Sequence, residues 1–230
     1  MAQWESIPVN VESVTTTPAR RPGGRTAAVR TAVLDAVADL LVESGLAGVE
    51  LTAVADRAGV GKSTVYRRWG TIGALVADLL HDMAETSVPR ADTGSLRGDL
   101  RANADLVRRT LSDPRSGGLF SSIIAAATFD ADTADALAMF YGRRIAQWSA
   151  CVDDGIERGE APAGTDGVAV VRAVSAPLYY QWLILRTPLT RRDAMRAADA
   201  ALAAVDAGVF TVRSRPHHGS PRAGPGTSVS

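Results

Sequence analysis

Apolar residues recur at helical spacing along most of this chain, a pattern that predicts helices rather than strands. The first helix is expected over Ala28 to Ser44, where Gly45 can end it. Its inward face would carry four apolar residues at i, i+4, i+7 and i+8, namely Val33, Val37, Leu40 and Leu41. Thr71 is a good N-cap for a later helix that stops before Pro89.

The C-terminal half shows the same spacing, interrupted by helix-breaking residues. The further helices expected there are Leu96 to Ser112, Gly117 to Phe129, Asp132 to Arg158, Val168 to Leu185 and Arg191 to Phe210. Pro177 lies inside the fourth of these and is expected to kink it, because proline donates no backbone hydrogen bond. Alanine is abundant and aromatic residues make up only 5% of the chain, which also favours helices. The sequence therefore predicts an all-α protein.

The stretch from Leu51 to Trp69 is expected to form two short helices around a tight turn. The first helix has an apolar stripe at i, i+3, i+4 and i+7, formed by Leu51, Val54, Ala55 and Ala58. Gly59 can adopt the left-handed backbone that ends a helix, and Gly61 is an acceptable N-cap for the second helix. In the second helix, Val65 and Trp69 lie four residues apart and are expected to point inward.

The outward side chains of the second helix suit contact with DNA. They are Lys62, Ser63, Thr64, Tyr66, Arg67 and Arg68. Cations bind phosphates, and short hydroxyl side chains bind phosphates or base edges. The chain has 25 basic and 25 acidic residues, so its formal net charge is zero. The basic signal is therefore local, with Arg57 close to the three cations of this helix.

A specific resemblance is carried by the run AGVGKSTVYRRW, from Ala58 to Trp69. This run is similar to the helix-turn-helix of the TetR family of bacterial repressors. The resemblance implies a three-helix DNA-binding domain followed by a larger helical domain that binds a ligand. It also implies a homodimer, paired through the last two helices, that binds a palindromic operator in double-stranded DNA. The candidate DNA contacts are Thr52, Lys62, Ser63, Thr64, Tyr66, Arg67 and Arg68.

Three positions depart from the family pattern. Glu50 stands where Ser or Thr usually caps a helix, Gly61 replaces a Ser cap, and Ile72 replaces a common phosphate-contacting Lys. These departures leave open a dimeric interaction module with a degenerate DNA head. A second alternative is a nucleotide-binding P-loop, GxxxxGK[ST], because Gly61-Lys62-Ser63 matches its end. Asp56 replaces the first glycine of that motif and helical spacing precedes it, so the DNA interpretation is favoured.

The resemblance also predicts a small, mostly apolar effector among the middle helices. The candidate wall residues are Phe120, Ile124, Tyr141, Trp148 and Tyr179, each of which is also an ordinary core residue. The last two helices offer an apolar face and a run of small residues as a dimer interface. These residues are Val171, Val174, Leu178, Trp182 and Leu185, then Ala194, Ala197, Ala198, Ala201, Leu202, Ala204 and Val205.

The chain is expected to divide into four segments. These are a disordered arm over residues 1–24, the DNA-binding domain over 25–89, the ligand-binding and dimerisation domain over 90–212, and a disordered tail over 213–230. Arg20, Arg21 and Arg25 in and beside the arm could reach a minor groove, although a solvated tail is the favoured interpretation.

Other classes of function find little support. The chain has no Ser, His and acid set in a recognisable context, no HExxH and no GxGxxG after a strand, so neither an enzyme nor a cofactor is expected. Asp130, Asp132 and Asp135 fall at a helix start, where acids favour the helix dipole, so no metal site is expected. Cys151 is the only cysteine, which indicates a reducing cytoplasm. The apolar run Ala173 to Leu185 is shorter than the roughly 20 residues that cross a bilayer.

Overall fold

A computed structural model of the chain describes residues 22–211, and it is helical throughout that range except for turns and one isolated β-bridge. The all-α prediction is therefore confirmed. The elements are α1 (Pro22–Ser44), η1 (Leu46–Gly48), α2 (Leu51–Ala58), α3 (Lys62–Arg68), α4 (Ile72–Glu85), α5 (Leu96–Ser112), α6 (Pro114–Ala127), α7 (Ala131–Glu157), α8 (Gly167–Tyr179), η2 (Tyr180–Ile184) and α9 (Arg191–Asp206).

The first helix is longer than predicted. It begins at Pro22 rather than Ala28, so the predicted arm over residues 1–24 is wrong at its C-terminal end. Proline is well tolerated at the first helical position, because the backbone N–H that it lacks would have no helical partner there. Arg25 lies in α1, whereas Arg20, Arg21 and the tail from residue 212 onward lie outside the described residues.

The other predicted helices are found with small changes at their ends. α5 has the predicted bounds, and α4 begins after Thr71, whose hydroxyl accepts a hydrogen bond from the Ala74 backbone N–H. The prediction was wrong for the helix around Pro177. There α8 ends at Tyr179, and the chain continues to Ile184 as a π-helical segment, η2. Helix geometry thus changes shortly after the residue that cannot complete the α-helical hydrogen-bond pattern.

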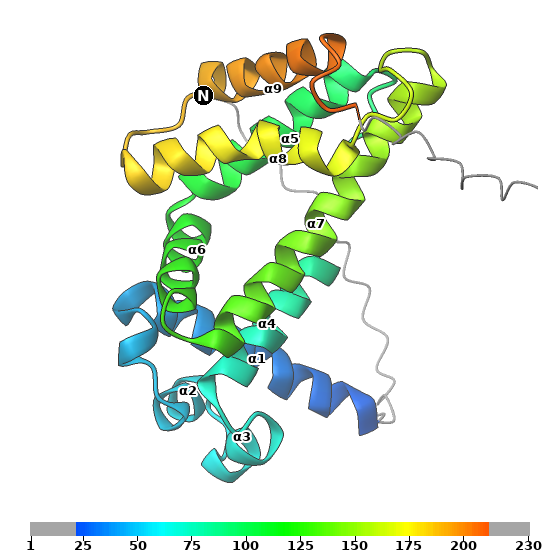
Figure 1. Ribbon diagram of the computed structural model, residues 1–230. Coiled ribbons are helices and arrows are strands. Elements are labelled where there is room, and N and C mark those ends of the chain that lie inside the picture. The colour runs from blue at the N-terminus through cyan, green and yellow to red at the C-terminus, as the bar shows by residue number, and fades with distance from the viewer. Residues whose placement is uncertain (1–21, 212–230) are drawn as a thin grey trace, which may run out of the picture.

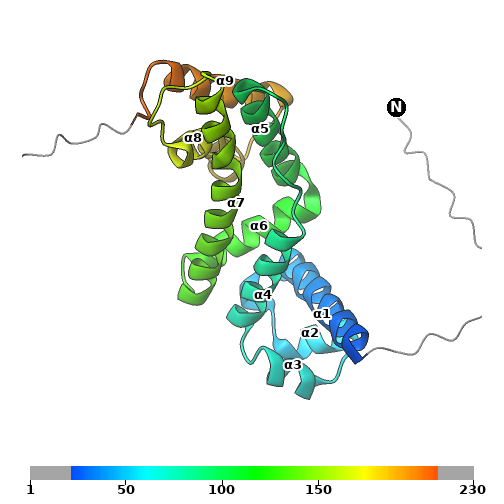
Figure 2. The ribbon, with the colours of Figure 1, turned by 90° about the vertical axis from the view of Figure 1, so that its right-hand side faces the viewer.

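The helices are arranged with α1 to α4 at one end of the molecule and α8 and α9 at the other (Figure 1). The two ends are joined by α6 and α7, as the view turned by 90° also shows (Figure 2). One apolar cluster is formed by buried side chains of α1 to α4, and it extends to α6 and α7 through Ile123 and Phe140. A second cluster joins α5, α7, α8 and α9 around Leu100, Val174 and Ala198. The two ends are thus connected by packed side chains rather than by a flexible linker alone.

The apolar faces expected at a dimer interface are occupied within the protomer. Most of these residues are buried against α5 and α7: Val171, Val174, Leu178, Ala194, Ala197, Ala198, Ala201, Leu202 and Val205. Their identification as interface residues was therefore wrong, because the same helical stripe already packs against this chain's own helices. Leu185 and Trp182 are not fully buried, and Leu185 is exposed. Cys151 is buried in this core, and burial raises the pKa of its thiol to about 12.

Candidate DNA-binding face and central cavity

The turn between α2 and α3 has the backbone that its glycine predicts. Gly59 has φ 66° and ψ 32°, in the left-handed region. The Gly59 N–H donates to the Asp56 carbonyl (3.3 Å), and the Val60 N–H donates to the Ala55 carbonyl (3.0 Å). This pair of bonds satisfies carbonyls that the end of α2 would otherwise leave without partners. Because Asp56 lies within helix α2 and no strand lies between residue 22 and Gly61, the P-loop alternative is contradicted.

Helix α3 turns its apolar residues inward as predicted. Val65 and Trp69 are buried in the apolar cluster of α1 to α4. Tyr66 is 50% exposed although it is a large aromatic residue. The other predicted contact residues are also accessible: Lys62, Ser63, Arg67 and Arg68 are exposed, and Thr52 and Thr64 are partly exposed. The structure therefore presents all seven candidate side chains to solvent around one short helix.

Some of these side chains have partners within the protein. The Lys62 ammonium lies 3.3 Å from the Asp56 carboxylate, and both side chains are more than half exposed. The Thr52 hydroxyl donates to Glu50, which forms no capping hydrogen bond with α2. The Arg68 guanidinium lies over the Trp69 ring, 4.9 Å from its centroid. These contacts are exposed and weak enough to be exchanged for a phosphate.

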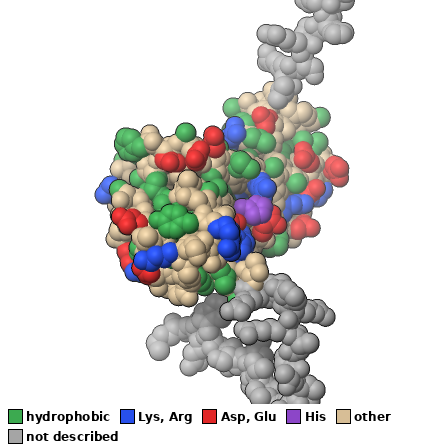
Figure 3. Space-filling view, turned by 90° about the horizontal axis from the view of Figure 1, so that it is seen from below, with side chains coloured by type: hydrophobic (Ala, Val, Ile, Leu, Met, Phe, Trp, Pro, Cys, Tyr) green, Lys and Arg blue, Asp and Glu red, His purple; other side chains and the backbone are tan. Residues whose placement is uncertain are grey.

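Arg57 does not join the basic cluster as expected. Its guanidinium donates to both carboxylate oxygens of Glu43 on α1, at 2.6 and 2.8 Å. The visible part of the face that carries α2 and α3 in Figure 1 shows basic and acidic side chains interspersed (Figure 3). Within α2 and α3, the cations available to DNA are therefore those of α3, and the surface around this helix is not uniformly basic.

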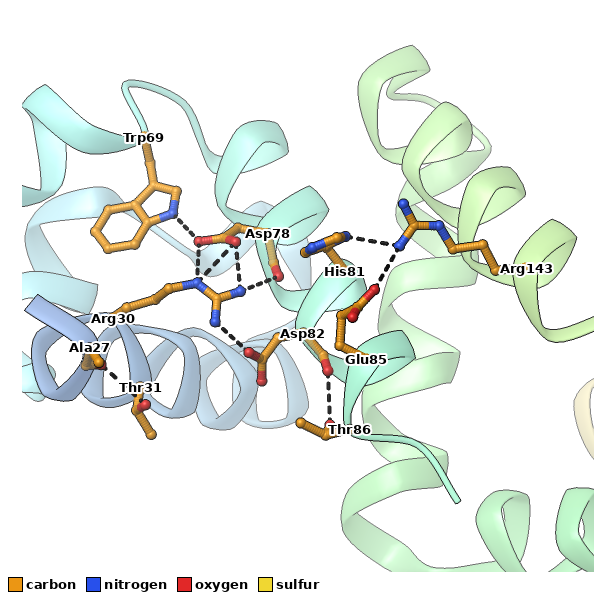
Figure 4. Close-up of polar contacts among 10 residues, drawn as sticks. All are labelled: Ala27, Arg30, Thr31, Trp69, Asp78, His81, Asp82, Glu85, Thr86 and Arg143. Carbon is orange, nitrogen blue, oxygen red and sulfur yellow. Dashed lines mark hydrogen bonds and ion pairs between the residues drawn. The ribbon is translucent and has the colours of Figure 1, made fainter. Parts of the chain in front are cut away.

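A polar cluster fixes the C-terminal end of α3 against α1 and α4 (Figure 4). The Trp69 indole Nε1 donates to Asp78 on α4 at 2.9 Å, and the Arg30 guanidinium donates to the same carboxylate at 2.8 Å. Arg30 also pairs with Asp82, one turn further along α4. Burial acts to raise the pKa of Asp78, but the hydrogen bonds from Arg30 and Trp69 outweigh it and hold that pKa below its usual value. Asp78 is therefore the acceptor that orients α3 relative to α4.

A cavity of about 300 Å³ lies among the middle helices. Its walls come from the residues directly after α4 and from α5, α6, α7 and α8. Four of the five predicted wall residues line it: Phe120, Tyr141, Trp148 and Tyr179. Ile124 is not among the lining residues and instead packs against the apolar cluster of α1 to α4. The Tyr141 and Tyr179 hydroxyls meet at 2.8 Å, and burial raises the pKa of both phenols.

Sequence reasoning missed several cavity residues. Asn103 follows Leu100 on the apolar stripe of α5, and Arg144 lies between Tyr141 and Trp148 on the inward side of α7. A polar residue at a position whose neighbours are apolar is a recognisable signal, because burying it is costly without a partner. Val88, which follows α4, is part of the wall as well. No sequence signal indicated that the connection after α4 would border this cavity.

The remaining candidates form no further site in the described part of the chain. His81 on α4 lies 3.0 Å from Arg143 on α7, which also pairs with Glu85 (Figure 4). Asp130 caps α7 by accepting a hydrogen bond from the Thr133 N–H, as acids at a helix start are expected to do. No three potential metal-ligand side chains gather within residues 22–211. None of the described helices is both long and apolar enough to cross a membrane.

The two ends of the molecule each match a described protein family. Residues 33–79 match the bacterial regulatory proteins of the tetR family, and residues 90–201 match the tetracyclin repressor-like C-terminal domain. The chain is 30% identical over 154 residues to the uncharacterized HTH-type transcriptional regulator YdeS of Bacillus subtilis. This match covers 66% of this chain and 77% of YdeS. It is also 30% identical over 177 residues to the DNA-binding transcriptional repressor TetR of Mycobacteroides abscessus. This match covers 75% of this chain and 92% of the repressor.

A solved structure shows the same architecture. The TetR family transcription regulator SCO0332 superposes with a TM-score of 0.62 at 28% identity, over 77% of this chain and 98% of that chain. The helix-turn-helix at one end, the helical body at the other and both family matches agree. The chain therefore belongs to the TetR family and is a helix-turn-helix, DNA-binding transcriptional regulator.

Proposed function

We propose that the protein is a homodimeric repressor that binds a palindromic operator and is released from it by a small, mostly apolar effector. The observation that carries this proposal is that α4 and the residues directly after it connect the two sites. The N-terminal half of α4 holds Trp69 through Asp78, and Thr86 to Val88, which follow the C-terminal end of the helix, border the cavity. Residues 25–89 act in this proposal as the DNA-binding unit and residues 90–212 as the effector-binding and dimerisation unit. We assign no catalytic role to the chain and place its action in the bacterial cytoplasm, where the DNA lies.

The DNA contacts proposed for α3 follow from exposure and side-chain chemistry. Lys62, Tyr66 and Arg67 would mainly grip phosphates, and Ser63 and Thr64 are best placed for base edges. All five side chains are exposed or partly exposed on a helix whose opposite face is buried. A helix of this size fits the major groove, and a two-fold dimer would present two such helices about 34 Å apart.

The dimer interface proposed here uses the outer surface of α8, η2 and α9. Tyr180, Ile184 and Leu185 belong to or directly follow η2, and all three are more than half exposed. The outward positions Ala200 and Ala203 on α9, and Ala207 directly after it, are small, which lets a partner helix approach closely. Exposed apolar side chains gathered at one end of a molecule are typical of a protein–protein contact. The end that carries them lies opposite α3 (Figure 1).

Selection of DNA from a pool of random duplexes tests this function directly. The expected product is one palindrome with half-sites about one helical turn apart, retained by wild-type protein and lost with Thr64→Ala or Tyr66→Ala. A matched change on the same motif, Arg57→Ala, should retain the palindrome, because Arg57 is already paired with Glu43. Recovery of no common sequence would instead support an interaction module with a degenerate DNA head.

A further inference from the structure

The cavity contains a single charged side chain. Among the described residues that line it, Arg144 on α7 is the only ionised one, and no acidic residue accompanies it. Arg144 forms no ion pair with any described residue. Its Nη1 donates only to neutral acceptors: the Ser87 hydroxyl (2.6 Å), the Val88 carbonyl (3.2 Å) and the Gln147 amide oxygen (2.5 Å). Because burial is not opposed by a carboxylate, it lowers the pKa of this guanidinium.

Two further polar groups in the wall lack partners. Asn103 and Trp148 are 4% and 3% exposed, and neither the Asn103 Oδ1 nor the Trp148 Nε1 has a hydrogen-bond partner among the described residues. Buried polar atoms normally find a partner, so such a pair beside one cavity indicates a ligand or ordered water between them. The indole N–H can only donate, and the Asn103 amide can turn either its oxygen or its NH₂ group toward the cavity.

The body of a ligand would meet apolar and aromatic surface. Phe120, Phe140 and Tyr141 stack in tilted and edge-on pairs beside the cavity, with ring centroids 5.3 to 6.2 Å apart. The volume of about 300 Å³ is at the lower end for small-molecule pockets. A compact apolar molecule fits such a space, and a polysaccharide, peptide or multiply charged nucleotide does not.

We propose that the effector is a compact apolar acid whose carboxylate binds the Arg144 guanidinium, with donors from Trp148 and Asn103 beside it. This inference rests on the proposed effector-controlled function and specifies its ligand class. A partly buried cation without a counterion loses part of its hydration, and a ligand carboxylate would supply the missing counterion. Arginine also offers carboxylates two parallel donors, which gives the contact direction as well as strength.

The same guanidinium links the cavity to the DNA-binding end. Through Ser87 and Val88, Arg144 attaches α7 to the chain just after α4. A carboxylate is a stronger acceptor than these two neutral groups, so its binding would draw the guanidinium away from Ser87 and Val88. Binding would therefore change how the end of α4 is held, and α4 carries the Asp78 acceptor of Trp69. A ligand shifts an equilibrium only if it prefers one of the two states, and this competition supplies such a preference.

Acids and their neutral amides test the proposal. The probes are 2-naphthoate with 2-naphthamide and decanoate with decanamide, measured at pH 7 by calorimetry on the full chain and by release of the selected operator. At least one acid should bind about tenfold or more tightly than its amide and release the DNA. Arg144→Gln should remove this difference. Arg143→Gln is the matched control, because Arg143 is the neighbouring arginine, pairs with Glu85 and does not line this cavity.

Three results would overturn the proposal: amides binding as tightly as acids, an acid preference that survives in Arg144→Gln, or no acid binding at all. If Arg144→Gln does not fold, the comparison of acids with their amides on wild-type protein still tests the proposal. Arg144→Lys, which keeps the positive charge, then serves as the second variant. If the amides release DNA as well as the acids do, the proposal that the effector is an acid is rejected, but the proposal that an effector controls DNA binding stands. Failure of the ligand-free protein to select any operator would instead reject the proposed function.

Discussion

The Trp69 indole donates a 2.9 Å hydrogen bond to the Asp78 carboxylate, and this contact joins the residue that ends α3 to the second turn of α4. Arg30 of α1 holds the same carboxylate from the other side. Three helices thus meet at one acceptor, behind the surface proposed to face DNA. The position of α3 on the protein depends on this acceptor as well as on the burial of Val65.

We predict that Asp78→Asn lowers the free energy of unfolding by about 2 kcal/mol, because it leaves Arg30 with a weaker partner and removes a charged acceptor from Trp69. Operator affinity should fall as well, since α3 loses its fixed orientation. Trp69→Phe keeps the ring and removes only the N–H, so a double-mutant cycle with Asp78→Asn measures how much of the indole contact depends on the charge of its acceptor. Urea unfolding and fluorescence anisotropy measure the two effects. Asp35→Asn, at an exposed acid of α1, is the control, and equal losses in both variants would contradict this role of Asp78.

The pH dependence of the same carboxylate has a definite sign. The pKa of Asp78 is lower in the folded protein than its usual value of about 3.9. Its stabilising contribution is therefore complete above that usual value and is lost as the pH falls through the lower, folded pKa. The stability difference between wild type and Asp78→Asn should be constant from pH 7 to about 5 and shrink below about 4. Urea titrations at several pH values measure it, and a difference that grows on acidification would be the opposite of this expectation.

Much of the DNA-binding half could be predicted from the sequence because its signals are local. Gly59 requires a left-handed turn, and Val65 and Trp69 share a helical face, so three positions define the motif without tertiary information. The partners of its charges could not be predicted in the same way. Glu43, which binds Arg57, lies on α1 and becomes a neighbour only when α1 packs across α2.

The cavity was harder to predict because its walls come from four helices and from the segment after α4. The aromatic residues Phe120, Tyr141, Trp148 and Tyr179 were identifiable as large side chains on inward faces. Whether an inward face meets another helix or borders a cavity depends on how the helices cross, and periodicity does not specify this. The same limit explains the error at Val171 and Val174: an apolar stripe indicates burial, but it does not distinguish packing within one chain from packing between two.

Lys62 and Asp56 form an exposed ion pair, and in the proposed complex a DNA phosphate would compete with Asp56 for Lys62. We predict that Lys62→Ala reduces the magnitude of the slope of log K against log [salt] by about 1.8, because the homodimer loses two phosphate contacts, one from each protomer. Asp56→Asn should raise operator affinity by about two- to fivefold, because it frees Lys62 and removes a negative charge near the phosphates. Anisotropy titrations at several salt concentrations measure both.

Arg57→Ala is the matched control for this pair of changes, because Arg57 lies on the same motif and is bound to Glu43 on its far side. Its slope should remain close to that of wild type. If the salt slope is unchanged in Lys62→Ala, Lys62 does not contact a phosphate. If Asp56→Asn binds the operator more weakly than wild type, Asp56 positions α3 rather than competing with DNA for Lys62.

Replacing Gly59 and Gly142 with alanine should change the stability of the protein in opposite directions. Gly59 has φ 66°, so Gly59→Ala forces a side chain into the left-handed region and should cost about 1–2 kcal/mol. Gly142 lies in the interior of α7, and no described atom is within 4 Å of the position that its Cβ would take. Gly142→Ala should therefore stabilise the protein by about 0.5–1 kcal/mol through helix propensity. Thermal and urea unfolding distinguish the two, and loss of stability in both variants would contradict the second assignment.

Ile184 on η2 is 61% exposed although it is fully apolar, and Tyr180 lies one helical turn before it. If this surface pairs two protomers, Ile184→Glu places charges on both sides of the two-fold contact. We predict that the dimer dissociation constant rises by at least about thirtyfold, the effect of about 2 kcal/mol at the centre of an interface. Sedimentation velocity measures the mass, and affinity for the full palindrome should fall with it while the helix content stays constant.

The matched control for Ile184 is Phe129, which is 96% exposed in the turn between α6 and α7 and lies outside the proposed interface. Phe129→Glu changes an exposed apolar residue in the same way and should leave the mass and the operator affinity unchanged. A dimer that survives Ile184→Glu but dissociates in Phe129→Glu would move the interface away from α8, η2 and α9. Because the spacing of the two recognition helices depends on which surfaces meet, the length of the selected palindrome would then also differ from one helical turn between half-sites.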